Sequence, residues 1–139
     1  MANAVVDTGH GATATFDSLS FNWTSIDMGE STLNDVPTSH LGTTGSETFL
    51  PGDLVNEGEV TIPFQWDAEA AYPTEGTVTT LTITFPQETG QTAPATYAGT
   101  AYIKRVRRPN LQTDTLQDGE ITVKWDGNTG PTWTAATTV

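Results

Sequence analysis

Few residues in this chain could do chemistry. It contains two histidines and no cysteine, which excludes a thiol nucleophile, a disulfide framework and a cysteine-based metal site. Ser39 and His40 are adjacent, but a catalytic triad needs an acid from elsewhere to orient the histidine, and sequence neighbours lack the required geometry. We therefore interpret Ser39 and His40 as loop residues, and His10 as a solvated residue near the N-terminus.

Oxygen ligands for a cation are a second possibility. Asp53, Asn56, Glu57 and Glu59 carry the carboxylate and amide oxygens that Ca²⁺ accepts, but their spacing matches no calcium loop. A turn at residues 51–53, followed by the solvated start of a strand, explains them better. The sequence also lacks a phosphate-binding glycine loop, an HExxH motif and a nucleophile elbow. We therefore expect no enzyme activity, no catalytic residue, no cofactor and no metal.

Charge is distributed very unevenly along the chain. The net charge is −12, and all five Lys and Arg residues follow residue 103. Four of them form one run: Lys104, Arg105, Arg107 and Arg108. Phosphate binding depends on positive charge, so this acidic chain is not expected to bind nucleic acid, although it could surround DNA without adhering to it. The basic run is either a solvated strand end or a contact with an acidic surface, which copies of this same chain would offer.

The length of 139 residues predicts a single domain over 1–139. Within it we expect a flexible N-terminal arm at 1–11, a long polar loop at 29–58 and a C-terminal tail at 127–139. The N-terminus has neither the basic region nor the apolar run of a secretory signal. No apolar stretch approaches the ~18 residues that a membrane span needs, so no membrane contact is expected.

Alternation of apolar and polar side chains predicts the strands. A first, broken strand covers 12–28, with a change of phase near Thr24 and Ser25. The other predicted strands, each with a clear period of two, cover 59–67, 77–86, 95–107 and 119–125. Threonine is the commonest residue and favours a pleated, half-buried surface, which agrees with this interpretation.

Two residues refine the fold prediction. Pro63 cannot donate a ladder hydrogen bond, so its strand is expected at a sheet edge or where the ladder is interrupted. Asp67, followed by good helix formers and ended by Pro73, predicts one helix of one to two turns. The predicted fold class is all-β: an antiparallel β-sandwich or open barrel with one short helix and a long polar loop.

Residues 38–67, TSHLGTTGSETFLPGDLVNEGEVTIPFQWD, carry the most distinctive pattern in the chain. They resemble a TxHxGTTGxxTFxPGxLxxxGE-type segment of the tail tube (major tail) proteins of long-tailed bacteriophages. The order of later elements is also similar: a strand ending in WDxE, a strand closing on TITFP and a PTW tail, so the resemblance spans roughly 12–133. The chain departs from the family in its very short helix and its more basic RVRRP run.

The resemblance implies a structural protein of a bacteriophage virion. Tail tube proteins form hexameric rings whose inner strands join into one continuous barrel, and the rings stack into the tube through which DNA passes. The expected partners are further copies of the chain and other tail proteins, such as tape measure, terminator and baseplate components. The double-stranded DNA would cross a negatively charged lumen without specific binding. The expected location is the virion tail, and the host cytoplasm during assembly.

The same resemblance places the contacts between subunits in the long loop, and the charge pattern adds the basic run. The expected inter-subunit or ring-stacking residues are His40, Thr43, Thr44, Glu47, Phe49, Leu50, Asp53, Leu54, Lys104, Arg105, Arg107 and Arg108. The alternative is a carbohydrate- or capsid-surface-binding (decoration) module that holds its ligand through Trp133 or Tyr72. Trp23, Trp66 and Trp125 are all predicted to face the core.

Overall fold

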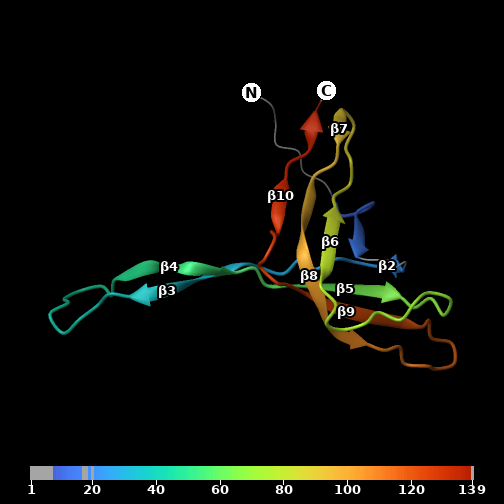
Figure 1. Cartoon of the computed structure of the whole chain (residues 1–139), viewed down its shortest axis with the longest axis horizontal. Helices are drawn as coiled ribbons and strands as arrows, with labels where there is room; N and C mark the ends of the chain where they lie inside the picture. Colours follow the sequence, from blue (N-terminus) through green and yellow to red (C-terminus); the bar gives the residue numbers. More distant parts are fainter. Residues whose placement is uncertain (1–7, 17–18, 20, 139) are drawn as a thin grey trace.

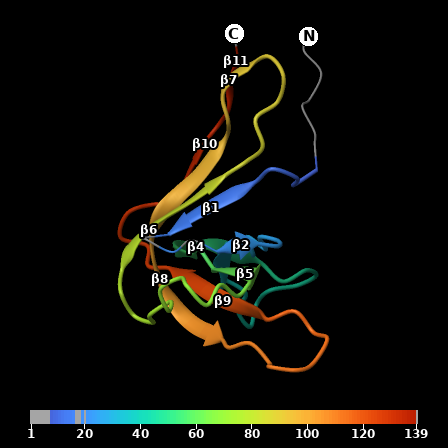
Figure 2. The same cartoon turned by 90° about the vertical axis from the view of Figure 1, so that its right-hand side faces the viewer.

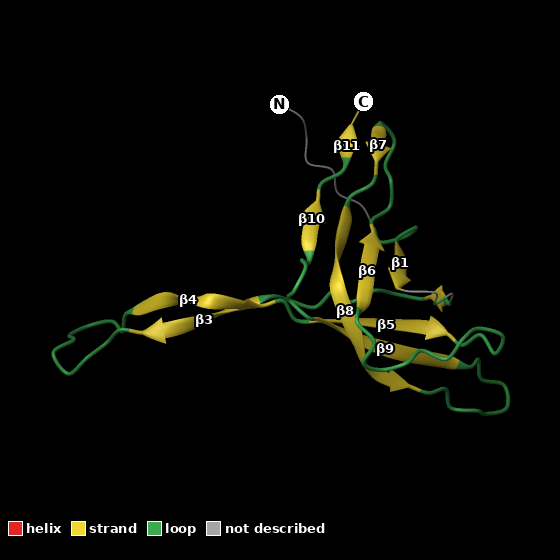
Figure 3. Cartoon of the chain, viewed as in Figure 1, coloured by secondary structure: helices red, strands yellow, loops and turns green. Residues whose placement is uncertain are grey.

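The computed structural model describes residues 8–16, 19 and 21–138, and these residues form strands and no helix (Figures 1 and 3). All strand pairs are antiparallel, which confirms the predicted fold class. In this part of the chain no helix has the length and apolar character to span a membrane. The strands are β1 (Thr13–Phe16), β2 (Asn22–Trp23), β3 (Thr32–Pro37), β4 (Phe49–Asn56), β5 (Glu59–Gln65), β6 (Thr79–Thr84), β7 (Gln91–Ala93), β8 (Thr96–Arg107), β9 (Asp118–Trp125), β10 (Thr132–Thr134) and β11 (Thr137–Thr138).

The main sheet bends around its longest strand, β8. Its strand order is β1-β6-β8-β9-β5-β2, with β10 also paired to β8. The first half of β8 pairs with β6 and β10, and its second half pairs with β9 (Figure 2). At the two ends of this order, the Trp23 indole Nε1 donates a hydrogen bond to the Ala14 carbonyl at 3.0 Å. This contact links β2 to β1, so the sheet approaches an open barrel.

The core lies between the two halves of this bent sheet. Every second residue of β5, namely Val60, Ile62 and Phe64, is completely buried, as the alternating pattern predicts. Phe64 is in ring contact with Phe21, Trp23 and Trp66. The predicted orientation of three tryptophans is confirmed, because Trp125 is buried and Trp23 and Trp66 pack against the core.

A bulge in β8 changes which of its side chains face the core. Ile103 pairs with Val123, but the next pair is Arg105 with Thr122, so Lys104 is an extra residue in its strand. The insertion shifts the alternation, so Val106 packs against the core. The chain has no glycine or proline at this point that would signal a bulge.

Pro63 is not in an edge strand, because β5 lies between β9 and β2. The other expectation, an interrupted ladder, describes the structure. Pairing with β2 stops at Trp23 and resumes only as an isolated bridge between Asp27 and Thr61. Between these points the Thr24 N–H donates to the Pro63 carbonyl at 3.0 Å. The ladder breaks where the sequence changes phase.

The predicted helix at residues 67–72 is wrong. The Glu69 N–H donates to Asp67 Oδ1 at 2.9 Å and the Ala70 N–H donates to the Asp67 carbonyl at 3.1 Å, which makes a single turn. Asp67 starts this turn, but too few residues follow before Pro73 to offset the cost of helix nucleation.

The long polar loop predicted at 29–58 is also wrong, because most of it forms an antiparallel hairpin of β3 and β4. The β3–β4 register is irregular between Leu33 and Asp35, and both strands are largely exposed, so no clear period of two marks them. Within the C-terminal tail predicted at 127–139, the described residues 127–138 include two strands, since β10 pairs with β8 and β11 pairs with β7. Most of the predicted N-terminal arm, residues 1–7, lies outside the described residues.

Candidate assembly interface

We define the hairpin as residues 32–56, comprising β3, β4 and the tip between them. It forms a separate two-stranded sheet that projects away from the main sheet (Figure 1). Leu33 pairs with Val55 and Val36 pairs with Leu50, and each of these four side chains is between 44% and 57% exposed. In β4, Leu50 and Val55 each follow another exposed apolar residue, and neighbouring strand residues point to opposite faces, so apolar side chains are exposed on both faces of the hairpin.

The tip of the hairpin, residues 38–48, is organised by hydrogen bonds. The Thr38 N–H donates to the Thr48 carbonyl at 2.9 Å, and the Thr48 N–H donates to Ser39 Oγ at 2.8 Å. His40 accepts the Gly42 N–H on Nδ1 at 3.1 Å. Ser39 and His40 thus shape the backbone of the tip, which agrees with their interpretation as loop residues. Leu41, between these contacts, is fully exposed.

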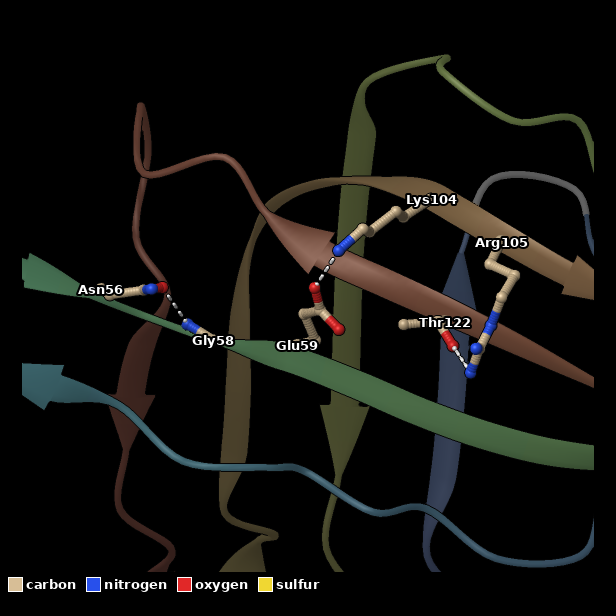
Figure 4. A network of polar contacts seen from close by, with 6 residues as sticks. All are labelled: Asn56, Gly58, Glu59, Lys104, Arg105 and Thr122. Atoms are coloured by element: carbon tan, nitrogen blue, oxygen red, sulfur yellow. Dashed lines mark hydrogen bonds and ion pairs between the residues drawn. The ribbon is translucent and has the colours of Figure 1, made fainter.

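Ion pairs within the chain surround the basic run on β8. Lys104 Nζ lies 2.6 Å from Glu59 Oε1, at the root of the hairpin (Figure 4). Arg105 Nη2 donates to the buried Thr122 hydroxyl at 3.2 Å, and the same nitrogen lies 3.6 Å from Glu120 Oε1. These contacts join β8 to β5 and β9 on the outer face of the sheet.

The other two arginines lie farther along. Arg107 Nη2 lies 3.7 Å from Asp118 Oδ2. Arg108 Nε donates to the Tyr72 hydroxyl at 3.0 Å, and the Tyr72 ring contacts Trp66. The distances from Arg105 and Arg107 to their acids are too long for hydrogen bonds, and their side chains are 68% and 49% exposed. Both guanidinium groups therefore retain capacity for a further acidic partner.

The Lys104 ammonium gives the root of the hairpin a measurable pH dependence. Its hydrogen bond lowers the pKa of Glu59 below the ordinary value of 4.5. Because this pKa is lower in the folded state, the pair stabilises the fold above about pH 4.5, and the contribution is lost as the pH falls through the folded-state pKa. The pair is exposed, so Glu59→Gln should cost less than about 1 kcal/mol at pH 7.

Urea unfolding at pH 7 and pH 3 measures this effect. The difference between wild type and Glu59→Gln should be present at pH 7 and shrink at pH 3. Glu47→Gln, at the hairpin tip, is the control and should change neither value. An equal loss at both pH values would show that Glu59 acts through packing and not through its charge.

The structure sorts the predicted interface residues into two groups. His40, Thr43, Thr44 and Glu47 lie at the tip, and the remaining loop residues lie on β4: Phe49, Leu50, Asp53 and Leu54. The basic residues lie on β8 or directly after it: Lys104, Arg105, Arg107 and Arg108. Lys104 pairs with Glu59, the first residue of β5, so the basic run begins beside the root of the hairpin. Their contacts with other subunits stay a prediction.

Sequence reasoning missed the residues that fix the root. Asp27 and Asn56 each accept the N–H of a glycine two residues later, Gly29 and Gly58, at 3.0 Å. The signal was available, because Asx-x-Gly-Glu occurs at 27–30 and again at 56–59. The in-chain acids Glu120 and Asp118 were missed for another reason: only the strand register brings them to the arginines.

The residues considered for ligand binding have other contacts. Trp133 packs edge-on against Phe85, with ring centroids 5.1 Å apart, and remains 53% exposed. Tyr72 is held between Trp66 and Arg108. Among the described residues no three His, Asp or Glu side chains are placed to hold a metal ion.

No protein-family model matches the sequence, and no curated protein matches it in sequence. The fold does have a counterpart among solved structures. A chain in the cryo-EM structure of the anti-feeding prophage (AFP) baseplate, 6-fold symmetrised, superimposes with a TM-score of 0.65. The match covers 97% of this chain and 98% of that chain, with 13% sequence identity. Over nearly its whole length, this chain therefore has the fold of a chain in that baseplate.

Proposed function

We propose that this chain is a structural subunit of a phage-tail-like particle, in which six copies form a ring and the rings stack into the tail tube. The observation that carries the proposal is the fold shared, nearly end to end, with a chain of a sixfold prophage baseplate. The segment at 38–67, which resembles tail tube proteins, supports the tube in preference to another component. The role is mechanical, not catalytic.

The hairpin supports assembly on physical grounds. A lone two-stranded hairpin is marginally stable in water at best. This one exposes apolar side chains on both faces, including Phe49 and Leu54. Covering them against another subunit would release water from that surface and stabilise the hairpin. We therefore infer that its tip and β4 contact neighbouring subunits.

The net charge supports a tube that DNA crosses without binding to it. A ring of six such chains would carry six times the net charge of −12. DNA phosphates would then be repelled by the ring and would pass without specific binding. The tape measure, terminator and baseplate proteins are the inferred partners, the host cytoplasm is the place of assembly and the particle tail is the final location.

Negative-stain electron microscopy of the purified protein tests this proposal. We expect rings or tubes with sixfold symmetry. Like-charged subunits repel over about 10 Å at 0.1 M salt and over about 3 Å at 1 M, so assembly should increase strongly as salt is raised.

A monodisperse monomer at high protein concentration, at every salt concentration, would contradict the proposed function. The same sample would then be tested for binding to carbohydrate and to capsids, which is the alternative that the exposed Trp133 leaves open. Rings of another symmetry would contradict the hexamer but retain the assembly role.

A further inference from the structure

Two matching turns connect the hairpin to the main sheet. On the incoming side, the Gly29 N–H donates to Asp27 Oδ1 at 3.0 Å. On the outgoing side, the Gly58 N–H donates to Asn56 Oδ1 at the same distance (Figure 4). Both glycines have positive φ, +68° and +84°, which side chains rarely adopt. A glutamate follows each glycine, so the two turns repeat one local structure.

The backbones of the two turns are also in close contact with one another. A Cβ atom at Gly29 would lie 2.1 Å from the Glu59 carbonyl oxygen, and one at Gly58 would lie 2.1 Å from the Glu30 carbonyl oxygen. Both obstacles are backbone atoms, which cannot move aside as the end of a side chain can. Each turn therefore leaves no room for a side chain at the glycine of the other turn. The Lys104 ion pair adds a further contact at Glu59.

We propose that these paired turns, at residues 27–30 and 56–59, form a rigid joint that presents the hairpin in a fixed direction to a second copy of this chain. The identity of the partner rests on the proposed function. The rigidity rests on the turns themselves. A preset direction lowers the conformational entropy lost on docking, because the hairpin does not have to be ordered when the partner arrives.

Charge complementarity points to a second copy as the partner. The segment from Glu30 to Glu57 carries five carboxylates and no Lys or Arg. All five basic residues of the chain lie on β8, on β9 or directly after β8. Of these, Arg105 and Arg107 are exposed and only loosely paired. The hairpin of one copy and the β8–β9 face of another are therefore oppositely charged surfaces of the same chain.

Spin-label distances test the joint. The chain has no cysteine, so Ser46→Cys at the tip and Thr80→Cys on β6 introduce the only two labelling sites. Pulsed electron paramagnetic resonance is recorded with labelled protein diluted into unlabelled protein, so that only distances within one chain are seen. We expect a narrow distribution for the otherwise wild-type chain, and one at least twice as wide, or displaced, for Gly29→Ala and Gly58→Ala.

Gly45→Ala is the matched control. Gly45 also has positive φ, +83°, but a Cβ there would meet nothing within 4 Å. It shares the backbone strain without the clash, so its distribution should stay narrow. If Gly58→Ala does not fold, Asn56→Ala replaces it in the test. This variant removes the acceptor of the Gly58 N–H without creating a clash, and it should widen the distance distribution. Asn56→Asp keeps an acceptor oxygen and should leave the distance distribution narrow.

Light scattering, at a salt concentration that supports assembly, tests whether the rigid joint promotes docking to a second copy. Gly58→Ala should assemble at least tenfold more slowly than wild type, and Gly45→Ala at the wild-type rate. A narrow, unchanged distribution in Gly58→Ala would overturn the joint, as would equal widening in Gly45→Ala. A wild-type chain with a narrow distribution that never assembles would instead overturn the partner and the proposed function, so the two failures are distinguishable.

Discussion

Replacing Phe64 with alanine should lower the free energy of unfolding by about 3–5 kcal/mol, the usual cost of removing a buried aromatic side chain. Phe64 is completely buried, and its ring centroid lies 4.2 Å from that of Phe21 and 5.5 Å from that of Trp66. Truncation would leave a cavity among these rings. A loss of this size is a large part of the 5–15 kcal/mol by which domains are typically stable.

Phe49→Ala is the matched control for this prediction. Phe49 has the same side chain but lies on the hairpin and is 52% exposed. In dilute monomer it should change the unfolding free energy by about 0.5 kcal/mol or less, as surface substitutions usually do. Urea unfolding followed by tryptophan fluorescence measures both variants. Similar losses at the two positions would mean that the hairpin packs against the body in solution, which would contradict its independence.

The strands of the main sheet were predictable because each has one buried face. Burial of one face imposes a strict period of two, which Val60, Ile62 and Phe64 display without interruption. The hairpin has no buried face within the chain, so its apolar residues follow no such constraint. Sequence reasoning therefore mistook two ordered strands for a loop.

The residue types of the candidate interface were predictable from the sequence, but the contacts that those residues make were not. The basic run is visible in the sequence, but its in-chain acids are set by the register of β8 against β9, which includes the bulge at Lys104. Asp118 and Glu120 lie more than ten residues away from the arginines, and no local signal connects them. The turns at the root of the hairpin left a local signal, but their mutual contact requires the fold.

Reversing two arginines, Arg105→Glu together with Arg107→Glu, should strongly weaken assembly while the monomer stays folded. The net charge would change from −12 to −16, since each reversal removes two positive units. Losing close charge pairs at an interface typically costs 2 kcal/mol or more, so assembly should weaken by about tenfold at least. The monomer should lose only about 1 kcal/mol, because its own pairs are exposed. Sedimentation in assembly salt and urea unfolding measure the two effects.

A charge swap separates contacts within the chain from contacts between chains. Arg107 lies directly opposite Glu120 in the register, so a carboxylate at 107 would face another one. Adding Asp118→Arg and Glu120→Arg to the double variant restores opposite charges on the two strands and returns the net charge to −12. If the arginines bind a neighbouring subunit, this quadruple variant should recover monomer stability and still fail to assemble, because positive charge would be missing at 105 and 107. If it assembles normally, the basic run only braces β8 against β9, and the interface lies with the hairpin alone.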